Sequence, residues 1–197
     1  MTKFHLIDPT LENTFRGVIL FGLNSASYKF ALGKALIELA PTGDDLVPLD
    51  VLADSFSKHI ALHVAHTPKQ STRTGGVKYF DLCADYNKGD LSKDKLVEYT
   101  VQNAFNDVID RFHIINGQEV ETRFYVDERK SNNGIRLTDD LHKLVSEQNG
   151  SDLLPEIESR WRLVETAWDL RLSRNTVAVG HEYDTGNLFV THNARRK

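Results

Sequence analysis

The sequence contains a single cysteine, Cys83, among its 197 residues. One cysteine excludes an intramolecular disulfide and is typical of proteins in a reducing compartment. No apolar run approaches the length of a membrane-spanning helix, and the N-terminal stretch MTKFHLIDPTLENTF lacks the apolar segment of a signal peptide. These absences predict a cytoplasmic protein with one compact domain, without a membrane partner.

The sequence also lacks an excess of positive charge. It has 24 Lys and Arg against 28 Asp and Glu, for a net charge of −4. This balance gives no overall preference for nucleic acid or anionic membranes, so any polyanion site must be a local patch. The 40% hydrophobic and 26% charged content is ordinary for a soluble globular protein.

Helical periodicity dominates the part of the chain that precedes residue 117. Within residues 17–40, a first apolar run ends at 22–25. After it, apolar residues recur three and four positions apart, which is the spacing of a helix. We expect Asp8 to cap the first helix and Asn24 or Ser25 to cap the second, over 25–40. The second helix should bury one face, formed by Tyr28, Ala31, Leu32, Ala35, Leu36 and Leu39.

Further helices are expected over 49–65, 79–87 and 92–112, the last of these capped by Ser92. Two more are expected, one capped by Thr138 and one that starts at 151–155. Strand alternation over 120–126 can pair with 135–137 across Asn133-Gly134, whose residues tolerate positive φ. A second hairpin is expected from 177–183 and 188–192. The predicted fold is α+β and predominantly helical, with residues 1–175 as one domain and 176–193 as a C-terminal hairpin.

One segment is locally basic. No acidic residue lies between Asp54 and Asp81, and the polar loop around 68–76 carries hydroxyl and amide donors suited to phosphate oxygens. Those donors are Gln70, Ser71, Thr72 and Thr74, and the cations of the segment are Lys58, Lys69, Arg73 and Lys78. The segment predicts contacts to a phosphate backbone, with a solvated loop as the competing interpretation.

Three histidines, His59, His63 and His66, recur at i, i+4 and i+7. One helix face could therefore present all three to a zinc ion. No Cys, Asp or Glu completes the set within that window, and surface histidines beside an apolar stripe are the favoured interpretation.

Glu128-Arg129-Lys130 follows an expected strand, the arrangement of PD-(D/E)xK nucleases. Two carboxylates would bind magnesium, and Lys130 would stabilise the attacking water. The upstream acid could be Asp107, Asp110 or Glu121. A hairpin tip with charged ends explains the triplet equally well.

Several long strings resemble the N-terminal region of a family of bacterial HNH endonucleases. They are RGVILFGLNSASYKFALGKALIELA, HTPKQ, NDVIDRFHIINGQEVETRFYVDER, GIRLTDDL and RWRLVETAWDLRLSRN, in this order along nearly the whole chain. The resemblance implies a nuclease module after this region, a ββα-metal fold in which histidine activates water and a divalent cation holds the phosphate. The expected strand, turn and helix would lie beyond Lys197, so none of the family's catalytic or metal-binding residues has a position here.

The resemblance therefore implies a DNA-recognition or scaffolding region of a restriction or phage-defence enzyme, not expected to cleave by itself. It could work beside a nuclease subunit or as a homodimer. The expected DNA contacts are the basic segment and a second group on the first hairpin, Arg129, Lys130 and Arg136. The alternatives are a protein-interaction or oligomerisation module without nucleic-acid binding and a metal-dependent nuclease that uses Glu128 and Lys130.

Overall fold

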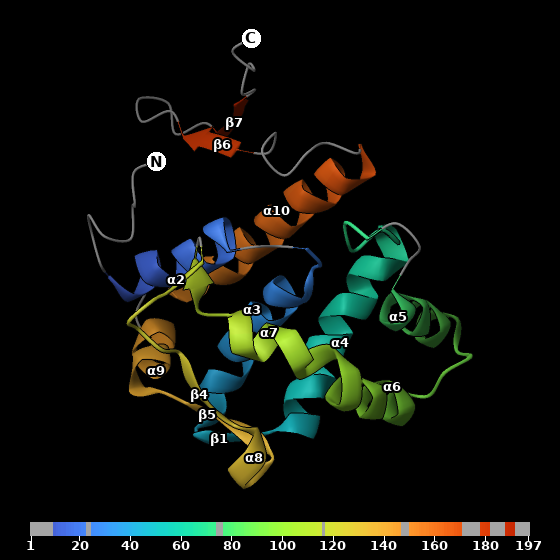
Figure 1. Cartoon of the computed structure of the whole chain (residues 1–197), viewed down its shortest axis with the longest axis horizontal. Helices are drawn as coiled ribbons and strands as arrows, with labels where there is room; N and C mark the ends of the chain where they lie inside the picture. The colour runs from blue at the N-terminus through green and yellow to red at the C-terminus, as the bar shows by residue number, and fades with distance from the viewer. Residues whose placement is uncertain are drawn as a thin grey trace.

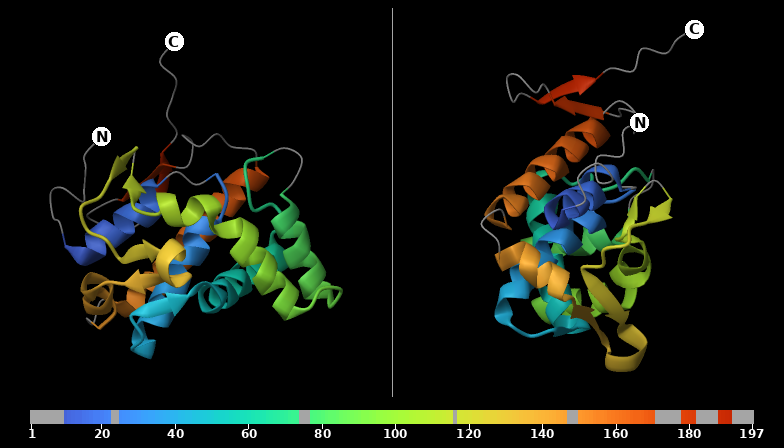
Figure 2. Two further views of the ribbon diagram at one scale, coloured as in Figure 1. Left: turned by 60° about the horizontal axis from the view of Figure 1, so that its bottom comes forward. Right: turned by 90° about the vertical axis from the view of Figure 1, so that its left-hand side faces the viewer.

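The computed structural model describes residues 10–22, 25–73, 77–115, 117–146, 150–170, 178–181 and 188–191. It has the helix-dominated α+β fold that the sequence predicts. Helix α3 (Tyr28–Leu39) runs through the centre of the molecule, as Figure 1 shows. Figure 2 shows α4 (Leu49–His66), α5 (Lys78–Lys88) and α6 (Lys93–Tyr99) on one side of it, and α2 (Leu11–Phe21) and α9 (Asp139–Ser146) on the other.

Helix α2 (Leu11–Phe21) begins at Thr10, whose hydroxyl accepts a hydrogen bond from the backbone N–H of Asn13 at 3.2 Å. The expectation that Asp8 caps this helix is wrong, because the threonine takes that role, and Asp8 lies outside the described residues. Phe15 and Val18 are fully buried, which places one face of α2 in the core.

The expected face of α3 is buried, with Ala31, Leu32, Ala35 and Leu36 at 0% exposure. The burial extends further than predicted and includes Gly33 and Lys29. The surrounding elements α2, α4, α7, α9 and α10 all contact α3. Its N-cap is Ser27, which makes no side-chain capping bond, and not Ser25. The backbone carbonyl of Ser25 instead accepts a hydrogen bond from Thr72. Asn24 lies outside the described residues.

Helix α4 (Leu49–His66) buries the expected stripe, formed by Leu52, Phe56, Ile60 and Val64. Helix α5 (Lys78–Lys88) packs along it, and the Asn87 side chain donates to the carbonyl of Ala61 at 2.8 Å. A short 3-10 turn, η1 (Ala40–Thr42), and strand β1 (Leu46–Pro48) connect α3 to α4.

The expected helix over 92–112 forms in three parts. Ser92 caps α6 (Lys93–Tyr99), as predicted, and accepts from the N–H of Lys95 at 3.4 Å. The helix then widens into the π-helical segment η2 (Thr100–Ala104) before α7 (Phe105–Arg111). The hydroxyl of Thr100 donates to the carbonyl of Leu96 at 2.7 Å and lies 2.9 Å from the hydroxyl of Tyr79.

The residues after α7 form a tight corner. Strands β2 (Ile114–Ile115) and β3 (Gln118–Glu119) pair across Gly117, which has a φ of 81°. His113 lies directly before β2 and is 2% exposed. Its Nε2 accepts a hydrogen bond from the backbone N–H of Phe124 at 3.0 Å. That bond requires the neutral tautomer with Nε2 unprotonated.

The three-stranded antiparallel sheet has the order β1-β5-β4, with Val47 opposite Ile135 and Val126 opposite Arg136. The expected hairpin is β4 (Tyr125–Glu128) and β5 (Gly134–Leu137), with the short helix α8 (Arg129–Asn132) between them. The strand begins later than the expected 120–126, because residues 120–124 precede β4, and the side chain of Val126 is 48% exposed. Its neighbours Phe124 and Tyr125 take the core positions.

Two further helices complete the domain. Thr138 caps α9 (Asp139–Ser146), as expected, and α10 (Gly150–Asp169) packs against α2, α3 and α9. Near the end of the chain β6 (Ala178–His181) pairs antiparallel with β7 (Leu188–Thr191), which matches the second expected hairpin. Among the described helices, none is long and apolar enough to cross a membrane.

Candidate functional site

The basic loop, defined here as residues 67–78, consists of the connection between α4 and α5 and the first residue of α5, and backbone hydrogen bonds hold it. Of these residues, 74–76 lie outside the described part of the chain. The carbonyl of Gln70 accepts from the N–H of Ser27 at 3.1 Å, and the N–H of Thr72 donates to the carbonyl of Ser25 at 3.0 Å. These bonds fasten the loop to the residues that precede α3.

The side chain of Gln70 points into the protein and is 1% exposed. Its Nε2 donates to the carbonyl of Thr67 at 2.8 Å and to the Glu165 carboxylate, while its Oε1 accepts from the indole N–H of Trp161 at 2.9 Å. The expectation that Gln70 and Ser71 offer donors to phosphate is therefore wrong, since both are buried inside the fold. Thr72 is exposed, and Thr74 lies outside the described residues.

His63 lies beside this amide. Its Nδ1 is 2.7 Å from Glu165 Oε1, and its Nε2 is 3.1 Å from Glu158 Oε2. The imidazole stacks on the Trp161 ring with 3.5 Å between centroids. We call His63, Gln70, Glu158, Trp161 and Glu165 the His63 cluster. It joins α4, the basic loop and α10.

Glu158 is the member of the cluster nearest to solvent. Burial alone would raise the pKa of its carboxyl, but hydrogen bonds from Lys34 and Arg162 and the charge of His63 lower that pKa to about 2. The ammonium of Lys34 is 2.9 Å from Glu158, and the guanidinium of Arg162 is 2.7 Å away. The carboxylate is therefore ionised at neutral pH and links α3 to α10.

The contacts of the cluster determine what it can do chemically. Both ring nitrogens of His63 already face carboxylates of the protein itself, so the imidazole has no free position for a substrate proton. Because the two carboxylates lie on opposite sides of the ring, they do not converge with it on one ion. The arrangement suits a buried anchor that fixes the basic loop.

The three histidines of α4 have different surroundings. His59 is 4% exposed, with Nε2 2.9 Å from Glu38 Oε2, whereas His66 is exposed at the end of the helix. Burial lowers the pKa of His59 despite the nearby carboxylate. The surface assignment is wrong for His59 and His63, because carboxylates from α3 and α10 make their burial possible. Within the described ranges, no three His, Cys, Asp or Glu side chains are grouped so that they could hold a metal ion.

The cations of the basic segment remain near the surface. Lys69 donates to the backbone carbonyl of Trp168, and the Lys78 ammonium lies 5.5 Å from the ring centroid of Tyr99. Arg73 is exposed, and no described carboxylate forms an ion pair with Lys69, Arg73 or Lys78. Lys58 lies about two turns before the end of α4, where its charge helps to lower the pKa of Glu38. The structure thus associates Lys58 with the α3–α4 contact and the other three cations with the loop.

The cations of the first hairpin are arranged differently. Arg129 forms ion pairs with Asp127 and Asp110 and donates to the carbonyl of Phe105 at 3.0 Å. Arg136 pairs with Glu128 at 2.8 Å. Lys130 on α8 is the exception, with no ion pair to a described carboxylate.

The contacts of Glu128 bear on the E-x-K hypothesis. Its carboxylate accepts from Arg136 and from Asn132, and these hydrogen bonds lower its pKa. Asp110, one of the possible upstream acids, pairs with Arg129. A metal ion at this position would have to replace these partners.

One buried cation escaped the sequence interpretation. Lys29 is 6% exposed, and its ammonium donates to the carbonyls of Phe112 and Ile114, just after the end of α7. Burial lowers its pKa to about 8. Lys29 therefore caps backbone carbonyls just beyond the C-terminus of α7.

Glu158 and Glu165 were also missed as site residues. Glu165 follows Trp161 by four positions, so it lies on the apolar stripe of α10. An acidic residue on an apolar stripe was the sequence signal that could have indicated a buried carboxylate. Cys83 and both tryptophans are buried. Comparisons with known protein families, with curated proteins and with solved structures found no match to this chain.

Proposed function

We propose that this chain is a DNA-recognition module of an HNH-type endonuclease, of the restriction or phage-defence kind, that contacts DNA phosphates and does not cleave by itself. The contacts are made by Lys69, Arg73 and Lys78. The observation that carries the proposal is that these cations have no described carboxylate partner and belong to a loop held by a buried cluster. A pre-arranged loop loses less conformational entropy on binding than a mobile one does.

The hairpin cations contribute less in this proposal. Arg129 and Arg136 already neutralise acidic side chains, so a phosphate would have to compete with Asp127 or Glu128. Lys130 and Lys58 are exposed and could add to the affinity, but each lies on a different element from the loop.

The test is duplex and single-stranded DNA binding, measured by fluorescence anisotropy between about 50 and 300 mM salt. Affinity should fall steeply with salt, and the slope of log K against log salt should become shallower by about 2 to 3 in a Lys69→Ala, Arg73→Ala, Lys78→Ala variant, because three phosphate contacts are lost. The matched control is Lys88→Ala, Lys143→Ala, Arg111→Ala, which removes the same charges from other exposed positions.

Two results would contradict the proposal. DNA binding could be absent even at the lowest salt, or both triple variants could lose affinity equally. Cleavage in magnesium or manganese that is abolished by Glu128→Ala or Lys130→Ala would instead support the nuclease alternative. A protein-interaction module remains the second candidate, and one groove on the surface specifically favours it.

A further inference from the structure

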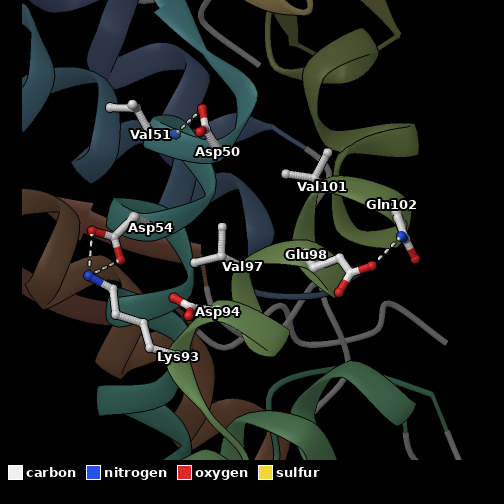
Figure 3. A pocket seen from close by; sticks show the side chains of 9 residues that line it. All are labelled: Asp50, Val51, Asp54, Lys93, Asp94, Val97, Glu98, Val101 and Gln102. Carbon is white, nitrogen blue, oxygen red and sulfur yellow. Dashed lines mark hydrogen bonds and ion pairs between the residues drawn. The ribbon is translucent and has the colours of Figure 1, made fainter.

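A groove of about 530 Å³ lies between the N-terminal half of α4 and the α6–η2 helix. Val51 lines the groove from α4, and Figure 3 shows Val97 and Val101 on the opposite wall, with their side chains directed toward α4. Val51 is 44% exposed, and the other two valines are half-buried. The groove therefore offers an aliphatic surface that the fold itself does not cover.

The rim of this groove is acidic. Asp50, Asp54, Asp94 and Glu98 line it, against a single ammonium from Lys93. Lys93 is 2.8 Å from Asp54 and links the two walls at one end. Asp50 accepts the N–H of Val51, and Glu98 accepts the side-chain amide of Gln102. No cation is paired in the structure with Asp50, Asp94 or Glu98 within the described residues.

The π-helical segment forms part of the wall. Val101 and Gln102 belong to η2, and the buried Thr100 hydroxyl holds the widened turn to Leu96 and Tyr79. A π-turn is less favourable than α-helix and occurs frequently at functional sites. The π-helical segment in the groove wall is independent of the charges on the rim, and it also supports a functional role for this surface.

We propose that this groove binds a basic amphipathic segment of a partner protein. Lysine or arginine side chains of the segment would pair with Asp50, Asp94 and Glu98, and an aliphatic side chain would contact Val51. The carboxylates repel a nucleic-acid backbone. A second copy that docked groove to groove about a two-fold axis would place like charges opposite each other. Charge complementarity therefore selects the basic protein segment.

The experiment uses three labelled peptides and fluorescence anisotropy. The first combines lysine with leucine at three- and four-residue spacing, the second replaces lysine with glutamate, and the third replaces leucine with serine. The whole chain should bind the first peptide most tightly, the third more weakly and the second not at all. Binding of the first peptide should weaken about tenfold when Asp50→Asn, Asp94→Asn and Glu98→Gln are combined.

The matched control combines Asp81→Asn, Asp107→Asn and Glu121→Gln, exposed acids outside the groove. It changes the overall charge by the same amount as the groove variant. It should leave the affinity within about twofold, because salt screens these acids from a ligand in the groove. Val51→Ser should reduce the affinity for the lysine–leucine peptide and leave that for the lysine–serine peptide unchanged. This second variant tests the apolar contact separately from the charges.

Three outcomes would overturn the proposal. One is the absence of binding at concentrations on the order of 0.1 mM. Another is an equal loss of affinity in the groove and control variants. The third is a dimer in sedimentation experiments that the groove variant dissociates, because the groove would then be an interface between copies of this chain.

Discussion

At the scale of single residues, Gln70 is the polar side chain on which the basic loop depends. One amide group satisfies Thr67, Trp161 and Glu165 together, and the last two of these partners are buried. Buried polar groups become costly when a partner is removed, because water does not replace it. The side chain of Gln70 therefore attaches the loop to the core, in addition to the backbone hydrogen bonds to Ser25 and Ser27.

Gln70→Leu should lower the free energy of unfolding by about 2 to 4 kcal/mol, because the Trp161 indole N–H and the Glu165 carboxylate lose a buried partner. Urea unfolding followed by tryptophan fluorescence measures this. Thr72→Ala is the control, since Thr72 is exposed and its change should stay within about 0.5 kcal/mol. Equal effects of the two changes would disprove the anchoring role.

His113 should make the fold sensitive to acid. Burial, with smaller contributions from Arg123 and Lys29, lowers its pKa from 6.5 to about 3. The unfolded chain therefore binds a proton more readily, and the stability that this histidine contributes is complete above about pH 6.5 and lost as the pH falls toward 3.

His113→Gln keeps an acceptor for the Phe124 N–H but does not titrate. Between about pH 7 and pH 4 the variant should lose less stability than the wild-type protein, by on the order of 3 kcal/mol. Denaturant unfolding at a series of pH values measures this difference. Parallel pH profiles would show that His113 is not the responsible group.

At the scale of elements, the sequence predicts helices better than it predicts their irregular parts. The periodic stripe of α4 and the caps of α6 and α9 were foreseeable because these signals are local. The π segment η2 was not, since only the contact between Thr100 and Tyr79 marks it. Strand β1 was also missed, because three residues carry no measurable alternation.

The candidate site divides in the same way. The basic loop was found because its charges are neighbours in the sequence. The His63 cluster was not found, because Glu165 is separated from His63 by 102 positions. Only the folded chain brings these groups together.

Gly134 illustrates a prediction that was right for a different reason. Positive φ is found at Asn133, at 50°, and not at Gly134. A Cβ at Gly134 would lie 2.5 Å from the carbonyl oxygen of Val47 on β1, so glycine permits the close approach of β5 and β1.

Gly134→Ala should therefore destabilise the protein by about 1 to 3 kcal/mol through overpacking between the strands. Thermal unfolding measures the loss. Asn133→Gly is the neighbouring control, expected within about 0.5 kcal/mol because both residues tolerate the left-handed conformation. A neutral Gly134→Ala variant would mean that β1 can move away from β5.

At the scale of the whole molecule, helix α4 connects two surfaces of opposite charge. The acidic groove borders its first turns, and the basic loop follows its last one. From Asp54 to His66 the helix rises about 18 Å, which exceeds the Debye length at physiological salt. The net charge of −4 conceals this separation.

The two surfaces should consequently act independently. Lys69→Ala with Arg73→Ala should reduce DNA affinity and leave the affinity for the lysine–leucine peptide within about twofold, since distant sites are nearly additive. The groove variant should show the reverse pattern. Anisotropy titrations of each variant with both ligands provide the measurement, and a reciprocal loss would indicate one shared site.

The His63 cluster also has a mechanical consequence. Glu158, Trp161 and Glu165 belong to α10, and the carbonyl of Trp168 near its end accepts from Lys69. A displacement of the basic loop would therefore either break these contacts or move α10 with it. In the second case, any segment joined to that helix would be displaced in step with the surface that we propose contacts phosphate.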